Sequence, residues 1–351
     1  MKAVIIRETG GPDKLLYEEV DTPSPGAGEV LVRIRAAGVN HLDHDIREGI
    51  AGFPTPVPHV PGIEGAGEVA EVGAGVTSVK VGDRVSISII AACGTCRLCR
   101  TGRENLCEAP NGALGLFMWG TYAEYTCVKE NQLVAMPDAL DFETAAAGHL
   151  CFATAWHMAV TLGAIHAGQD VLVNAAGSGV GSSAIQIAKL HGANVIASAG
   201  SDEKLERAKQ LGVDGVINYT TQDLAEEALS LTGGKGPDLV IESVGGEVLQ
   251  KSLAAVAKAG AVITCGCHAG ETVEVDVVSL FRKHVRFQGS ALATLFETAE
   301  VLSLLAEGKL KPAIHATMPL EKANEAAELT ANRNFFGKMV LLPQSNVIGE
   351  I

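Results

Sequence analysis

The sequence predicts an α/β protein with two domains, one rich in short β-strands and one built on a doubly wound parallel sheet. A length of 351 residues suits two domains of ordinary size. Before about residue 165, apolar and polar residues alternate in short runs, whereas after it strand-like runs alternate with helix-like runs. We expect a first domain over residues 1–160, a second over 161–300, and a C-terminal segment, 301–351, that returns to the first domain.

The first domain shows the period-two pattern of half-buried antiparallel strands. In EVLVRIRAA the residues Val30, Val32, Ile34 and Ala36 share one face, and in GDRVSISII apolar residues alternate with serines. Gly and Pro separate these runs, as in PSPGAGE.

The second domain contains six strand-like runs with helical runs between most of them. The six runs are DVLVNAA, ANVIASA, DGVINY, PDLVIES, GAVITCG and HVRFQGS. Strands that alternate with helices imply right-handed crossovers and therefore a parallel, doubly wound sheet. After this domain, PLEKANEAAELTAN predicts an amphipathic helix and GKMVLLP a last strand.

Composition and charge narrow the class of protein. Hydrophobic residues make up 47% and charged residues 19%, as in globular proteins with real cores. The formal net charge is −14 and no basic cluster stands out, which disfavours nucleic acid and anionic membranes as partners. No run of 18 apolar residues occurs, and MKAVIIRETG is typical of a first strand, not of a signal peptide. We expect a soluble, cytoplasmic protein.

Four of the eight cysteines lie in one short stretch, CGTCRLCRTGRENLC, over residues 93–107. Cys93, Cys96, Cys99 and Cys107 have the spacing C-x2-C-x2-C-x7-C, which lets successive thiolates bind one tetrahedral zinc ion. Four thiolates leave no open position for water or substrate, so such a zinc would stabilise the fold without catalysing a reaction. Free surface thiols and an iron–sulfur cluster are the alternatives.

A glycine-rich turn between a strand and a helix, in VLVNAAGSGVGSSAIQIAK, predicts a dinucleotide site. The pyrophosphate would lie on the turn formed by Gly177, Ser178, Gly179 and Val180. The G-x-G-x-x-G pattern is imperfect, because Ala176 and Ser178 stand at its first two glycine positions. A purely structural tight turn is the alternative.

The ends of the following strands predict a preference for NADPH. An enzyme that prefers NAD places an acidic residue at the end of the second strand, but this chain has Gly200 and Ser201 there, followed by Lys204. Tyr219 ends the third strand. An uncharged strand end with a nearby lysine suits the 2′-phosphate of NADPH. The alternative is that Lys204 is simply solvated on the first turn of its helix. Val244 and Gly266, at the ends of two later strands, complete the predicted cofactor-binding set.

Taken in order, these motifs resemble the medium-chain dehydrogenase/reductase superfamily over nearly the whole chain. The resemblance rests on GEVLVRIRAAGVNHLD, PGIEGAGEVAEVGAGV, VGDRV, the four-cysteine lobe, FETAAAGHLCFATAWH, the glycine turn and FGKMVLLP. It implies a GroES-like catalytic domain, a Rossmann domain, a nicotinamide cofactor, and a homodimer or homotetramer. It also implies that Thr154 lies beside the nicotinamide. The lobe is similar to that of zinc alcohol dehydrogenases, whereas AAGVN, TAW and AGSDEK are more similar to quinone oxidoreductases.

The chain departs from this family where zinc alcohol dehydrogenases hold a second, catalytic zinc. The three matching ligand positions carry Asn40, Ile63 and Leu150, which cannot build that site. The nearby Cys151 is interpreted as an ordinary buried residue, with a reactive thiol as the alternative. A zinc ion with unusual ligands is also considered. Its candidate ligands are His41, Asp43, His44, His59 and Glu64.

These departures predict reduction of an already polarised acceptor. Without a catalytic zinc nothing lowers the pKa of an alcohol, whereas a quinone or an α,β-unsaturated carbonyl accepts hydride at carbon with less help. Asn40 or His41 would donate a hydrogen bond to the acceptor's oxygen, and His41, Asp43 or water would return the proton. The runner-up is a zinc alcohol dehydrogenase with atypical ligands. A third reading is a cofactor-binding protein with little turnover. Candidate wall residues are Phe53, Phe117, Trp119 and Phe296.

Overall fold

The computed structural model describes residues 1–50, 52 and 54–343, and the chain divides into two compact units. Unit 1 combines Met1–Leu150 with the chain from Thr294 onward, and unit 2 is Cys151–Ala293. The first division falls inside helix α3 (Phe142–Trp156) and the second directly before α9 (Leu295–Ala306), whereas the sequence places the borders at 160/161 and 300/301.

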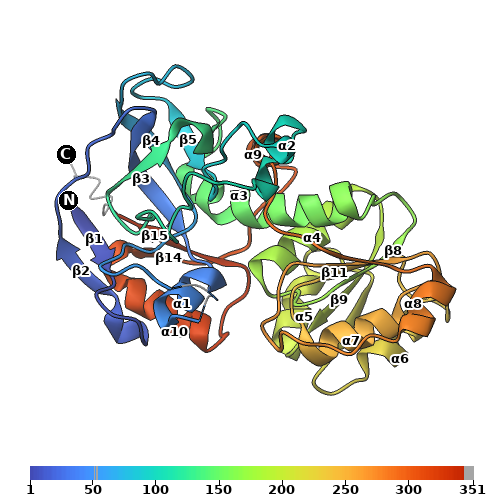
Figure 1. The fold of residues 1–351 in the computed structure, drawn as a ribbon. Helices are drawn as coiled ribbons and strands as arrows, with labels where there is room; N and C mark the ends of the chain where they lie inside the picture. The colour runs from blue at the N-terminus through green and yellow to red at the C-terminus, as the bar shows by residue number, and fades with distance from the viewer. Residues whose placement is uncertain (51, 53, 344–351) are drawn as a thin grey trace. The chain divides into compact units, whose positions relative to one another are not determined.

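Unit 1 is built on a mixed seven-stranded sheet (Figure 1). Its strands are β3 (Glu29–Gly38), β4 (Gly65–Val72), β5 (Arg84–Ile87), β6 (Tyr125–Lys129), β7 (Leu133–Ala135), β14 (Ile314–Pro319) and β15 (Lys338–Leu342). The order is β14-β15-β3-β4-β5-β7, and β6 pairs with β3. The C-terminal segment thus returns to this sheet, with β15 parallel to β14 and antiparallel to β3.

Unit 1 also contains a two-stranded sheet and several short helices. The strands are β1 (Lys2–Ile5) and β2 (Leu16–Glu19). Besides α9, the helices are α1 (His41–Glu48), α2 (Arg97–Arg100), α10 (Ala323–Ala331) and the short 3-10 turns η1 (Pro12–Lys14), η2 (Glu104–Leu106), η3 (Glu130–Gln132) and η5 (Leu320–Lys322). The residues predicted to share one face of β3, Val30, Val32, Ile34 and Ala36, are all fully buried in the core.

Unit 2 is the predicted doubly wound parallel sheet. Its strands are β8 (Asp170–Val173), β9 (Asn194–Ala199), β10 (Gly215–Asn218), β11 (Leu239–Glu242), β12 (Ala261–Thr264) and β13 (Arg286–Gly289). All neighbouring pairs are parallel, in the order β10-β9-β8-β11-β12-β13. Numbered within the sheet this is 3-2-1-4-5-6, the order of dinucleotide-binding folds, so the fold class is confirmed.

The helices of unit 2 connect these strands and bury the sheet. They are the π-helical segment η4 (His157–Leu162), α4 (Gly179–Leu190), α5 (Asp202–Lys209), α6 (Leu224–Leu231), α7 (Gly246–Ala255) and α8 (Val277–Lys283). A cluster of apolar side chains from β8 to β12 and from α6 and α7 forms one core. Within the described part of the chain, no helix has the length and apolar character needed to cross a membrane.

Candidate functional site

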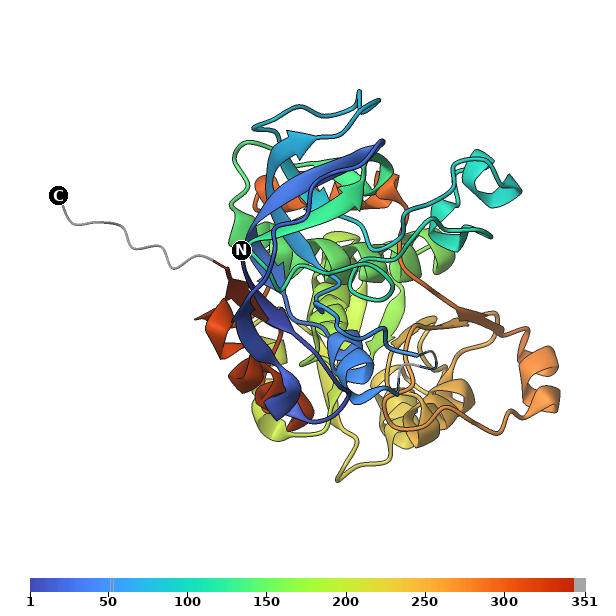
Figure 2. The same ribbon diagram turned by 60° about the vertical axis from the view of Figure 1, so that its left-hand side comes forward.

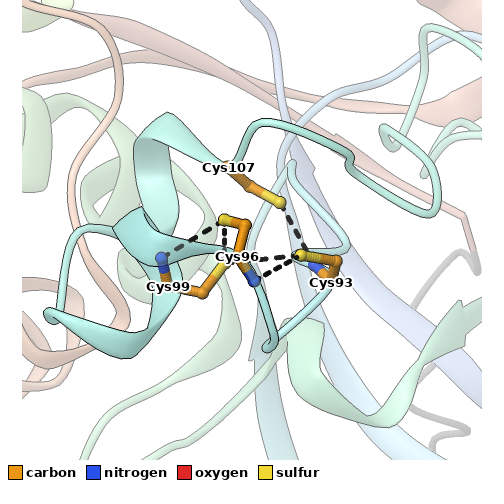
Figure 3. Close-up of side chains that lie close together, drawn as sticks. All are labelled: Cys93, Cys96, Cys99 and Cys107. Carbon is orange, nitrogen blue, oxygen red and sulfur yellow. Dashed lines mark hydrogen bonds between the residues drawn. The ribbon is translucent and has the colours of Figure 1, made fainter.

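The four clustered cysteines lie on the loop that carries α2, which extends away from the sheet of unit 1 (Figure 2). Their side chains point toward one another, and their sulfur atoms all lie within 4.8 Å (Figure 3). The Sγ atoms of Cys96 and Cys99 are 3.4 Å apart, and those of Cys93 and Cys99 are 3.9 Å apart. Tetrahedral zinc with bonds of about 2.3 Å would separate its sulfur ligands by about 3.8 Å, so the geometry fits zinc.

Backbone N–H groups lower the pKa of Cys93 and Cys96, whereas burial and the neighbouring thiols raise the pKa of Cys99. Cys96 N–H lies 3.3 Å from the Cys93 sulfur, and Cys93 N–H lies 3.2 Å from the Cys107 sulfur. Hydrogen bonds from the backbone of Thr95 and Cys96 lower the pKa of Cys93 to about 6. Four thiolates this close would repel one another, and a bound dication removes that repulsion.

The glycine-rich turn follows β8 and opens α4, as the sequence predicts for a phosphate-binding turn. Ser178 is the N-cap of α4, and its hydroxyl accepts a hydrogen bond from Gly181 N–H at 2.9 Å. Gly179 and Val180 form the first turn of the 12-residue helix, so their N–H groups have no intrahelical carbonyl partner. The stem of Lys204 packs against Gly177, where a Cβ would lie 2.8 Å from Cδ of Lys204, so a larger residue would displace this lysine.

The other predicted cofactor residues also lie in unit 2, most of them at the carboxyl ends of its strands. Ser201 caps α5 by accepting from Lys204 N–H at 3.4 Å, and the ring of Tyr219 lies against Gly200, where a Cβ would be 3.2 Å from Cε2. Helix α5 also carries Asp202, whose carboxylate accepts a hydrogen bond from Asn218 at 2.7 Å.

The remaining three predicted residues follow β11 and β12 or lie on α3. Val244 donates its N–H to the buried Glu242 carboxylate at 2.6 Å, and Thr264 donates its hydroxyl to the same carboxylate at 2.9 Å. Glu242 therefore joins the ends of β11 and β12. A Cβ at Gly266 would lie 2.5 Å from the carbonyl oxygen of Ser243, and Thr154 is half-buried on α3.

A buried polar cluster in unit 1 contains Asn40 and two residues that the sequence analysis did not assign to the site, Lys338 and His149. The Lys338 ammonium donates to the Glu64 carboxylate at 2.7 Å, to Asn40 Oδ1 at 2.6 Å and to the Val39 carbonyl at 2.8 Å. Nδ1 of His149 lies 3.6 Å from the other carboxylate oxygen of Glu64. The Glu64 side chain is 0% exposed and that of Lys338 is 5% exposed.

The Glu64 carboxylate remains ionised in this cluster. Burial alone would raise its pKa, but the charges of Lys338 and His149 and the hydrogen bonds from Lys338 and Asn40 lower it overall. Both Asn40 amide hydrogens are used inside the cluster, one on Glu64 at 2.9 Å and one on the Gly38 carbonyl at 3.2 Å. Asn40 in this orientation therefore has no amide hydrogen left to donate to a substrate. Of the two donors predicted from the sequence, Asn40 and His41, this geometry disfavours Asn40.

Asp43 is buried and supports the loop around Asn40. Its carboxylate accepts hydrogen bonds from Asn40 N–H at 2.9 Å, Ile63 N–H at 3.1 Å and the Tyr122 hydroxyl at 3.0 Å. Burial, partly offset by these hydrogen bonds, raises the pKa of Asp43 from 3.8 to about 6. Asp43 thus holds α1 in place through its neighbours.

His41 begins α1 and is partly exposed. Its Nε2 lies 3.5 Å from Asp45 Oδ1, and 30% of its side chain is exposed. Burial, with the charges of His44 and Arg333, lowers the pKa of His41 to about 4. The imidazole is therefore neutral at pH 7.

The positions that would ligate a catalytic zinc are occupied as follows. Ile63 is buried, and the N–H of Leu150 donates to Glu64 at 2.9 Å. His59 is buried, and its Nε2 lies 2.7 Å from the Gly115 carbonyl.

In the described residues, the group of potential ligands outside the lobe is His41, His44 and Asp45, whose ligand atoms lie within 4.8 Å of one another. Arg47 donates to Nδ1 of His44 at 2.8 Å, which places the proton of a neutral His44 on Nε2 and opposes ligation there.

The aromatic residues considered as pocket walls have different surroundings. Phe117 and Phe296 are exposed by 61% and 73%, whereas Trp119 packs against the core of unit 1. Phe53 lies outside the described residues. Cys151 is buried.

Comparison with known proteins assigns the family. A model of the alcohol dehydrogenase GroES-like domain matches residues 26–138, and a model of the zinc-binding dehydrogenase matches residues 179–307. An alcohol dehydrogenase of Geobacillus stearothermophilus is 35% identical over 342 residues, which cover 97% of this chain and 99% of the relative. The chain belongs to the medium-chain dehydrogenase/reductase superfamily.

Relatives of this medium-chain dehydrogenase carry the names of more than one reaction. A 2-haloacrylate reductase of Burkholderia sp is 33% identical over 360 residues, which cover 98% of this chain and 99% of the relative. A solved structure described as an NAD-dependent alcohol dehydrogenase superposes with a TM-score of 0.91 and 43% identity, covering 98% of this chain and all of the other. The protein is an NAD(P)-dependent oxidoreductase of the alcohol-dehydrogenase-like type.

The residues that sequence reasoning missed, Lys338 and His149, carry weak local signals. Lys338 is a single charge in the otherwise apolar run KMVLL, and His149 interrupts the apolar face of AAAGHLCFA. A charged residue in an apolar run indicates that its side chain has a buried partner, but the local sequence does not identify that partner.

Asp43→Asn is expected to change how stability depends on pH. The folded state binds the Asp43 proton more tightly than the unfolded state, because the pKa is raised from 3.8 to about 6. Ionising this carboxyl between pH 4 and pH 7 therefore costs the wild type roughly 2.4 kcal/mol. The free energy of unfolding of the variant minus that of the wild type should rise by about this amount from pH 4 to pH 7.

Urea unfolding at several pH values measures this difference, and Asp13→Asn, at an exposed carboxylate, is the matched control. A difference between variant and wild type that stays flat across this range would contradict the proposed cost of burying Asp43.

Proposed function

We propose that this medium-chain dehydrogenase is an NADPH-dependent reductase that transfers hydride to a quinone or an α,β-unsaturated carbonyl without a catalytic metal. The observation that carries the proposal is the Lys338 ammonium, which is bound by Val39, Asn40 and Glu64 beside the expected zinc ligands. The Lys338 ammonium already occupies Asn40 Oδ1 and one oxygen of Glu64, so neither atom is free to ligate a catalytic zinc. The other two ligand positions carry the apolar side chains of Ile63 and Leu150.

The residues of the chain have separate roles in this proposal. When bound, NADPH supplies the hydride to the acceptor's carbon, and negative charge develops on the acceptor's oxygen. The neutral imidazole of His41 donates a hydrogen bond to that oxygen, because both amide hydrogens of Asn40 are already used. With a pKa of about 4, His41 has almost no proton to give at pH 7, so water supplies the proton, to the α-carbon of an enone or to the oxygen of a quinone.

The preference for NADPH rests on the end of β9. Gly200 and Ser201 stand where an acidic residue would grip the ribose, and the stem of Lys204 lies across Gly177 toward the predicted phosphate turn. Asp202 is directed to Asn218 instead. A lysine in this place suits a 2′-phosphate.

The competing proposal is a zinc-dependent alcohol dehydrogenase with atypical ligands. It is favoured by the closeness of His41, His44 and Asp45, and opposed by the Arg47 hydrogen bond to His44. The two proposals differ in the number of zinc ions: one for a structural site alone, two for a catalytic site in addition.

The deciding experiment combines metal analysis with a substrate screen. Folded, chelator-washed protein should contain one zinc per chain, retained in Asn40→Ala and Ile63→Ala. It should oxidise NADPH with quinones or enones faster than it oxidises alcohols with NADP+. Two zinc ions per chain together with alcohol oxidation would establish the competing proposal.

We also propose that the protein is a cytoplasmic homodimer or homotetramer. A reducing compartment keeps the lobe thiols available for metal. The four residues of the edge strand β13 are exposed, and Phe281 of α8 and Phe287 of β13 are exposed by 59% and 38%. An exposed edge strand with apolar neighbours suits pairing across a two-fold axis. Sedimentation velocity distinguishes one, two and four copies.

A further inference from the structure

The Lys338 ammonium sits in a cradle of three oxygen atoms that are all within 2.8 Å of it. They are the Val39 carbonyl, the Asn40 side-chain oxygen and one oxygen of Glu64. An ammonium group has three hydrogens, so the cradle offers one acceptor for each. The lysine comes from β15 and all three acceptors lie in other segments of unit 1.

The cradle fixes which way the Asn40 amide faces. Because Lys338 donates to Oδ1, the other end of the amide is the NH2 group, which donates to the same Glu64 oxygen as Lys338 and to the Gly38 carbonyl. Glu64 is held in turn by Leu150 N–H on its second oxygen. The polar side-chain atoms of Asn40 and Glu64 are thus each held by a hydrogen bond.

The same cradle fixes the start of α1. Two of its three oxygen atoms belong to Val39 and Asn40, the two residues that directly precede His41, the first residue of α1. Asp43 fastens this turn from the other side through Asn40 N–H. The position of the His41 imidazole is therefore tied to the position of the Lys338 ammonium.

We propose that Lys338 is the positioning residue of this site: its ammonium serves as a built-in cation that clamps Val39 and Asn40 and thereby holds His41 where it meets the substrate. This inference rests on the proposed function, because it assigns His41 the role of hydrogen-bond donor. The clamp depends on geometry as well as charge. A planar guanidinium cannot satisfy three acceptors arranged around a point as an ammonium does.

The test compares variants that keep or remove the clamp. Lys338→Met alone leaves Glu64 as an unpaired buried charge, which threatens folding. Glu64→Gln likewise leaves Lys338 without its counter-ion, but it keeps the clamp on Val39 and Asn40. We therefore compare folded Glu64→Gln with the double variant Glu64→Gln/Lys338→Met, which removes the clamp and leaves no buried charge. The double variant should have a kcat about 30 to 100-fold below that of Glu64→Gln, with the Kd for NADPH changed less than threefold. Equal kcat values in two folded variants would overturn the proposal.

Lys338→Arg gives an independent test that does not require loss of charge. It should keep a melting temperature close to that of the wild type and lose about tenfold in kcat, because the charge stays but the tripodal geometry does not. Full activity in Lys338→Arg would overturn the clamp geometry.

Hydrogen exchange separates this inference from the proposed function. Amides of residues 39–44 should exchange at least tenfold faster in the double variant than in Glu64→Gln, whatever substrate the enzyme uses. A wild type that reduces no quinone or enone would refute the proposed function, and the exchange rates would still decide the clamp. Unchanged exchange in this segment would overturn it.

Discussion

Cys96→Ser should remove the zinc ion and lower the melting temperature of the protein. Serine replaces a strong zinc ligand by a weak one, and three remaining thiolates no longer close the tetrahedral site. The metal content should fall from one zinc per chain to below about 0.1, because structural zinc and the fold of its loop depend on each other. The lobe, residues 93–107, should become sensitive to proteases.

The substitution is specific for the metal, because Cys96 is also the N-cap of α2 and serine is a good N-cap. Cys127→Ser, at a half-buried cysteine outside the lobe, is the matched control and should retain its zinc. Zinc that remains bound in purified Cys96→Ser would contradict the assignment of the four-cysteine site.

Lys204→Ala should weaken NADPH binding by about 10 to 100-fold and leave NADH binding nearly unchanged. A charge-assisted hydrogen bond to the 2′-phosphate contributes roughly 1.5–3 kcal/mol, and NADH has no group to receive it. Fluorescence titration or calorimetry with both cofactors measures the two dissociation constants.

The control for this substitution is Lys209→Ala, at the end of the same helix α5, where the lysine is exposed and pairs with Glu206. Equal losses for NADPH and NADH in Lys204→Ala would remove the proposed role of this lysine. A wild type that binds NADH more than tenfold tighter than NADPH would overturn the cofactor preference altogether.

Much of unit 2 is predictable from sequence because its signals are local. Five of its six strands are short apolar runs, with β13 (RFQG) as the exception, and the glycine turn directly joins a strand to a helix. The cysteine lobe is equally local, since its four ligands lie within fifteen residues. Such features need no knowledge of distant contacts.

Unit 1 contains features that local sequence patterns do not predict. The alternation in GDRVSISII predicts an exposed face for the serines, yet Ser86 is fully buried, so both faces of β5 are covered at this position. The polar cluster is less predictable still, since Lys338 and Glu64 are 274 positions apart. Periodicity indicates that a side chain is buried, but only the paired strands reveal which opposite charge lies beside it.

The position of β15 inside the unit 1 sheet sets an order of events during protein synthesis. β15 lies between β14 and β3 and is made hundreds of residues after β3. Unit 2 is one continuous segment, so it can fold as soon as that segment has left the ribosome, whereas unit 1 must wait for its last strand. Until then, the Ala37–Gly38 end of β3 lacks its partner strand and the buried Glu64 carboxylate lacks its lysine. A nascent chain halted before β15 would therefore carry a finished nucleotide domain beside an open, aggregation-prone sheet.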